Sequence, residues 1–285
     1  MKKEIKRIQH FIQDYIRDDE KVAIAISGGL DSDVVARLCV KALGKDRVKL
    51  FMALQDNMEE HHIQNARELA MDLDMNLAEI DMRNLNTEII RRLEEGDCEV
   101  GFNSNSLLDP SRAKCSLRTV LLSSYQEKGY FIAGTSNKTE IKLGFFLPFG
   151  DNIAHFKPIA HLYKSEVRQL AREIGTLKDV IIQPASAGFW KGQEDLEDIA
   201  YWIYYKGPIP GGTQFTNKDD QEVMKIKSHL TTELIDDVIR GIDDKKDFDI
   251  IVEELNIPTS IVEGIASIIK QANIVKNRQL LKTIS

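Results

Sequence analysis

The chain has 285 residues, of which 42% are hydrophobic and 29% are charged, and its formal net charge is −7. This length allows one large α/β domain with a smaller helical extension. The acidic balance argues against broad affinity for nucleic acid or for anionic membrane surfaces. Neither a bilayer-spanning apolar run nor a signal-peptide core is present in the sequence. Three widely spaced cysteines, Cys39, Cys98 and Cys115, favour a reducing, cytoplasmic setting.

After an amphipathic segment at 4–17, an apolar run at 22–26 leads into Ser27-Gly28-Gly29-Leu30-Asp31-Ser32 and then into helical spacing. This pattern predicts a buried strand, a tight turn and a helix N-terminus. Such a turn binds anions, because glycines let the backbone approach and the helix dipole favours negative charge. Ser27 and Ser32 can add hydroxyl donors. Asp31 would repel a phosphate unless a cation lay between them, so we predict that it binds magnesium. The alternative is an ordinary glycine-rich turn.

Strands and helices then alternate along the chain. The pattern predicts further strands over 48–54, 77–80 and 130–133, and helices over 58–73, 84–95 and 111–128. Such alternation is typical of parallel βαβ units in a doubly wound sheet, whose ligands lie beyond the carboxyl ends of the strands. The polar stretch 96–110 is predicted as a loop, and His61-His62 as a solvated helix start.

A second strand end carries glycine, hydroxyls and an acid, in Gly134-Thr135-Ser136-Asn137-Lys138-Thr139-Glu140. Glu140 is either a helix-capping side chain or a second metal ligand. Lys164 begins a clear helix, where a cation gains nothing from the dipole; this favours an anionic ligand, although a solvated lysine is the commoner outcome. The irregular segment 184–193 is either a loop over a site or a plain connection.

We predict an α/β domain over 1–200, an insertion over 201–229 and a helical tail over 230–285 packed on the same domain. Helical patterns at 247–255 and 258–271 could pass for a helix-turn-helix. Acidic residues outnumber basic ones in this region, which is unfavourable for DNA binding. We therefore interpret the tail as structural.

The order of these motifs resembles that of the ammonia-dependent NAD synthetases, which belong to the N-type ATP pyrophosphatases and have an adenine nucleotide alpha-hydrolase-like fold. The resemblance covers about 21–200 and resumes weakly near Leu230. It rests on the motif Ser27–Ser32, Lys114 with Ser116-Leu117-Arg118, Gly134–Glu140, Gly144-Phe145-Phe146 with Phe149-Gly150-Asp151, Pro158-Ile159 with Leu162-Tyr163-Lys164, and Pro184 with Ser186-Ala187-Gly188 and Gly192-Gln193.

The resemblance implies a role for each matching residue. ATP would be bound by a set that spans the chain: Ser27, Gly28, Gly29, Ser32, Arg118, Thr135, Lys164 and Ser186. Asp31 and Glu140 would hold Mg²⁺, and Lys114 and Asp151 would lie at the acceptor. Asp31 and Lys164 would be the catalytic pair. The family works as homodimers, so a homodimer is implied here.

The implied reaction is ATP-dependent amidation of deamido-NAD through an acyl-adenylate, with ammonia as the nitrogen donor. The departures from the family lie on the acceptor side, at Pro148, Asn152-Ile153-Ala154-His155 and Thr232. An adenylating ligase for another carboxylic acid therefore stays open, as does an ATP-binding module without turnover. A tRNA-modifying pyrophosphatase is disfavoured by the acidic balance and the scattered cysteines. We expect ammonia to arrive free or from a separate partner.

Overall fold

A parallel four-stranded sheet forms the centre of the structure, which is a computed structural model that describes residues 1–106, 108–147, 150, 153–186, 188, 192–208 and 216–279. The strand order is β3-β2-β1-β4. The strands are β1 (Lys21–Ala25), β2 (Val48–Leu54), β3 (Leu77–Asp81) and β4 (Tyr130–Ile132). The chain moves outward from β1 to β3 and then returns to the other side of β1. Strand order therefore reverses between β1 and β4, where a doubly wound sheet binds its ligands.

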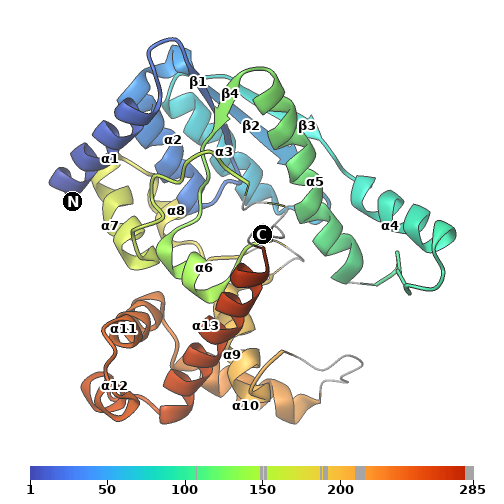
Figure 1. Cartoon of the computed structure of the whole chain (residues 1–285), viewed down its shortest axis with the longest axis vertical. Coiled ribbons are helices and arrows are strands. Elements are labelled where there is room, and N and C mark those ends of the chain that lie inside the picture. Colours follow the sequence, from blue (N-terminus) through green and yellow to red (C-terminus); the bar gives the residue numbers. More distant parts are fainter. Residues whose placement is uncertain are drawn as a thin grey trace, which may run out of the picture.

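Helices cover both faces of this sheet, as Figure 1 shows. One face carries α1 (Lys2–Tyr15), α2 (Leu30–Leu43), α3 (Glu60–Asp72), α7 (Lys164–Ile174) and α8 (Lys178–Ile182). The other face is covered by α5 (Leu108–Glu127), against which α4 (Leu85–Gly96) packs, and a short 3-10 helix, η1 (Lys45–Arg47), precedes β2. The prediction of a doubly wound parallel sheet is confirmed.

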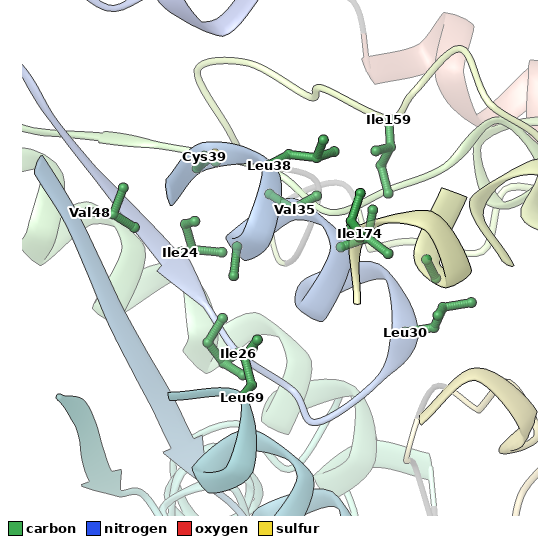
Figure 2. Close-up of a cluster of buried hydrophobic side chains, with 14 of the residues drawn as sticks. Ile24, Ile26, Leu30, Val35, Leu38, Cys39, Val48, Leu69, Ile159 and Ile174 are labelled. Carbon is green, nitrogen blue, oxygen red and sulfur yellow. The ribbon is translucent and has the colours of Figure 1, made fainter. Parts of the chain in front are cut away.

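The main core lies between the sheet and α2. Val22, Ile24 and Ile26 point into it, whereas Ala23 points to the α5 face, because side chains alternate along a strand. Figure 2 shows the β1 side chains meeting Val35 and other side chains of α2, with Ile159 and Ile174 closing the cluster from later in the chain. This packing fixes the N-terminus of α2 against the end of β1.

A second core joins the C-terminal helices to the α/β part. It contains α9 (Asp195–Tyr205), α10 (Asn217–Ser228), α11 (Thr232–Asp243), α12 (Phe248–Leu255) and α13 (Thr259–Gln279). These helices lie together in the lower half of Figure 1 and reach the sheet-bearing part through α6 (Lys138–Leu143) and α7. The predicted helical tail is confirmed, whereas the boundaries at residues 200 and 230 stay a prediction.

Helix α5 begins at Leu108 rather than at the predicted residue 111, so Pro110 lies within its first turn. Proline is tolerated there, because the missing N–H would have no intrahelical partner. None of the described helices combines the length and apolar character needed to cross a membrane. Cys39 and Cys115 are buried and Cys98 is exposed, and none of these three described cysteines forms a disulfide.

Candidate active site

The turn after β1 is held in a strained shape that only glycine accepts. Gly28 has φ +75°, and a Cβ atom there would lie 1.9 Å from the backbone oxygen of His62. The hydroxyls of Ser27 and Ser32 lie 3.1 Å apart, and the Ser27 hydroxyl accepts the Gly29 N–H at 3.2 Å. Both histidines lie in the first turn of α3, as predicted, but only His61 is exposed, whereas His62 is half-buried beneath the turn after β1.

Two side-chain amides that no sequence motif indicated hold the carbonyl of Gly28. Asn65 Nδ2 donates to this oxygen at 3.3 Å and Gln183 Nε2 donates to it at 3.1 Å. Asn65 also donates to Gln183 Oε1 at 3.0 Å, which joins α3 to the segment after α8. These bonds orient the peptide between Gly28 and Gly29. Their partners lie far apart in the chain, so no local pattern marks them.

The predicted metal and phosphate ligands meet at the ends of β1 and β4. Lys164 Nζ contacts Asp31 Oδ2 and lies 3.1 Å from Glu140 Oε1. Asn137 Nδ2 donates to Asp31 Oδ1 at 2.9 Å, and the Asn137 side chain also caps α6 by accepting the Glu140 N–H at 3.0 Å. The Glu140 side chain in turn accepts the Asn137 N–H at 3.3 Å, so Glu140 both caps α6 and shares the Lys164 ammonium with Asp31. These residues come from α2, α6 and α7, so the fold brings together positions that are 133 residues apart.

Negative charge is in excess around Lys164. Burial raises the pKa of Glu140 to about 7, opposed by Lys164 and reinforced by the carboxylates of Asp31 and Asp195. Burial acts to lower the pKa of Lys164, but its contacts with Asp31 and Glu140 raise that pKa above its ordinary value. The Lys164 ammonium therefore stays charged, and Asp31, Glu140 and Asp195 all favour that charge.

A second group of predicted residues lies at the end of β2, the strand next to β1. Lys114 and Arg118 lie one turn apart on α5 and share Gln55: its Nε2 donates to the Lys114 carbonyl at 2.7 Å, and its Oε1 accepts from Arg118 Nε at 3.0 Å. Lys114 Nζ donates to the carbonyls of Asp56 and Gly188. Burial lowers the pKa of Lys114, with a smaller contribution from Arg118.

The remaining predicted residues lie in loops. Thr135 follows β4, in the connection to α6. The Ser186 hydroxyl accepts the Gly188 N–H at 3.0 Å, and Gly192 N–H donates to Glu59 Oε1 at 3.3 Å, so the 184–193 segment reaches the start of α3. Asp151, the predicted acceptor residue, lies outside the described residues, as do Pro148 and Asn152.

A pocket of about 540 Å³, including its open mouth, adjoins the Lys164 cluster. Its polar end is formed by Asn137, Glu140, Lys164 and Asp195, and its walls are apolar side chains of α6, α9 and α11. The site therefore lies between the α/β part and the C-terminal helices.

Comparison with known proteins assigns the family. Residues 4–206 match the NAD synthase family. The chain belongs to the NAD synthase family. The family match covers the whole sheet and ends just after α9. The resemblance inferred from the motifs is confirmed.

Several curated relatives in this family are named NH(3)-dependent NAD(+) synthetase. The relative from Methanocaldococcus jannaschii is 33% identical over 222 residues, which is 74% of this chain and 84% of the relative. The relative from Archaeoglobus fulgidus is 34% identical over 69% of this chain and 78% of its own length. The relative from Thermococcus sibiricus is 29% identical over 95% of this chain and 92% of its own length.

Solved structures share the fold over the full chain, including the C-terminal helices. An NMN synthetase from Francisella tularensis gives a TM-score of 0.71 at 21% identity, covering 100% of this chain and 98% of the other. An NH3-dependent NAD synthetase from Campylobacter jejuni gives a TM-score of 0.65, also at 21% identity, covering 100% and 98%.

Proposed function

We propose that the chain catalyses ATP-dependent amidation of deamido-NAD, forming NAD, AMP and pyrophosphate. The observation that carries the proposal is Lys164 held between Asp31 and Glu140 where β1 and β4 end. The nicotinate carboxylate attacks the α-phosphorus of ATP and pyrophosphate leaves. Ammonia then attacks the acyl carbon, the bond to AMP breaks, and a proton is released from nitrogen.

The triphosphate would lie on the turn between β1 and α2. The serine contacts in this turn are 3.0–3.2 Å long, and phosphate oxygens would replace them as partners of the Ser27 and Ser32 hydroxyls. The N-terminus of α2 favours the negative charge. Lys164 would neutralise the α-phosphate as charge builds up during adenylation, with Arg118 and Ser186 completing the phosphate contacts and Thr135 beside the adenosine.

The residues present fit a magnesium ion. Mg²⁺ takes one or two carboxylates together with phosphate oxygens and waters, and the described residues contain no cluster of three acidic, histidine or cysteine ligands. Asp31 and Glu140 supply the two carboxylates, and their excess charge favours a divalent cation. Bound there, magnesium would screen the triphosphate and make pyrophosphate a better leaving group.

The acceptor would lie beside Lys114, near the end of β2, and Asp151 stays a predicted acceptor residue. The buried ammonium of Lys114 is suited to a nucleotide phosphate or to the reacting carboxylate. One protein of similar fold is named NMN synthetase. Nicotinate mononucleotide is therefore the second acceptor to test.

The deciding experiment is turnover with ATP, magnesium, ammonium and each acceptor, following NAD or NMN together with AMP. Deamido-NAD is expected to give NAD, whereas AMP formation with another acid alone would reassign the acceptor. Asp31→Asn, Glu140→Gln and Lys164→Ala should each lower acceptor-dependent exchange of pyrophosphate into ATP by about 100-fold or more. The exposed Asp46→Asn is the matched control. ATP binding without any pyrophosphate release would refute catalysis.

We also propose that the protein works as a homodimer in the cytoplasm. Leu85, Ile89 and Leu93 form an apolar stripe along α4, each between 39% and 44% exposed, and Val120 of α5 is 58% exposed. Such a stripe is a candidate for burial against a second copy. Sedimentation of Ile89→Arg beside the wild type tests this: a monomeric wild type would refute the dimer. Three cysteines outside any disulfide are consistent with a reducing compartment.

A further inference from the structure

An aspartate from the C-terminal helices lies fully buried behind the Lys164 cluster. Asp236, on α11, has 0% of its surface exposed and lies among the core residues Ile235 and Val238. A buried carboxylate is costly unless its oxygens accept hydrogen bonds. Asp236 Oδ2 accepts the Ser165 N–H at 2.8 Å, and Oδ1 accepts the Thr139 hydroxyl. The carboxylate is therefore paired through both oxygens.

These bonds reach two helices that carry site residues. Thr139 directly precedes Glu140 on α6, and its hydroxyl oxygen accepts the Lys164 N–H at 2.9 Å. Ser165 follows Lys164 in the first turn of α7. The Asp236 carboxylate thus lies at the positive end of α7, where N–H groups need acceptors and negative charge is favoured. The Asp236 side chain therefore connects the Thr139 side chain, next to Glu140, to the backbone just after Lys164.

Further polar contacts fix α11 in this position. Arg240, one turn after Asp236, pairs with Glu166 of α7 at 3.0 Å and lies 4.0 Å over the Tyr163 ring. Asp243, near the end of α11, lies 3.5 Å from Lys138 of α6 and also pairs with Lys142. The polar face of α11 therefore contacts both α6 and α7, which leaves Asp236 little freedom to move.

We propose that Asp236 is a positioning residue for adenylation: by joining Thr139 to the first turn of α7, it sets the placement of the Lys164 ammonium relative to Glu140 and to the α-phosphate. The inference rests on the proposed function. Helix α11 lies outside residues 4–206, which match the family, and by this proposal it helps to position the catalytic residues.

The substitution Asp236→Asn tests the idea with little change in volume. A carboxylate accepts two bonds here, whereas an amide offers one acceptor and one donor group. If the amide oxygen of the substituted side chain faces Thr139, its NH₂ group faces the Ser165 N–H, and two donors oppose each other. If the amide oxygen faces Ser165, the Thr139 hydroxyl proton loses its acceptor. Either orientation leaves one mismatch, which should shift the start of α7.

We expect kcat for acceptor-dependent ATP–pyrophosphate exchange to fall about 10- to 100-fold in Asp236→Asn. The KM for ATP should change by less than about threefold, because the ground-state phosphate contacts remain. The exposed neighbour Asp237→Asn is the matched control and should keep wild-type kinetics. A folded Asp236→Asn with wild-type kcat would reduce Asp236 to a purely structural role and overturn the proposal.

A second pair of variants keeps the test decisive if Asp236→Asn does not fold. Thr139→Ser retains the bridging hydroxyl and should keep kcat near the wild type, whereas Thr139→Val removes it and should lower kcat; equal values would overturn the proposal.

Adding Asp236→Asn to Lys164→Ala should cause no further loss, since Asp236 acts through Lys164. If Lys164→Ala alone leaves exchange intact, the proposed function fails instead, so the two failures are distinguishable.

Discussion

Gly28→Ala is expected to be one of the most damaging single-methyl additions in the chain. The residue has φ +75°, a conformation that costs an L-residue about 1–2 kcal/mol. The new Cβ would also lie 1.9 Å from the His62 carbonyl oxygen, so α3 or the turn must move by about 1 Å or more. Overpacking of this kind typically costs about 1–3 kcal/mol. Together these give a loss of roughly 2–5 kcal/mol in unfolding free energy.

Gly129→Ala separates the two contributions. Gly129 has φ +84°, but a Cβ atom added there would have nothing within 4 Å, so this substitution carries the backbone cost alone. Urea denaturation should rank wild type, Gly129→Ala and Gly28→Ala in falling stability. Only Gly28→Ala should also lose about tenfold or more in turnover, since it displaces the turn that faces ATP. Equal stability of the two variants would refute the argument from the His62 contact.

Two further predictions concern buried charge. Burial raises the pKa of the Asp198 carboxyl from 3.8 to about 6, so the folded state binds a proton there more tightly than the unfolded state and loses stability as pH rises from about 3.8 to about 6. Asp198→Asn should therefore be more stable than the wild type by at most about 3 kcal/mol above pH 6 and equal to it near pH 3.5. Urea denaturation at both pH values measures this difference. Arg37→Met should cost about 3–5 kcal/mol because it leaves the buried Asp33 charge unpaired, whereas Asp72→Asn, at a side chain that is 52% exposed, should cost about 1 kcal/mol or less by thermal denaturation.

The sheet and the turn after β1 were predictable because local patterns encode them. Apolar runs bounded by polar residues give the strands, and glycines followed by helical spacing give the turn. The meeting of Asp31, Glu140 and Lys164 follows from the same logic, since the carboxyl ends of neighbouring parallel strands share one edge of the sheet. The topology of the sheet was therefore enough to predict that these three residues lie together.

The supporting residues could not be predicted in the same way. Gln183 holds the Gly28 carbonyl from 155 positions away, and Asp236 reaches Thr139 across 97 positions. An Asp among apolar helix residues looks like a solvated position until the packing of α11 is known. Pro110 shows the opposite case, in which a helix-breaking residue is harmless at the start of α5.

The three thiols differ enough in reactivity to make the unmodified protein a spectroscopic tool. Burial raises the pKa of Cys39 to about 12 and Cys115 is also buried, so an alkylating dye should attach at Cys98, just after α4. Mixing donor-labelled and acceptor-labelled protein would then place the dyes beside the α4 stripe. Resonance energy transfer between them would report subunit exchange in real time, without introducing a single substitution.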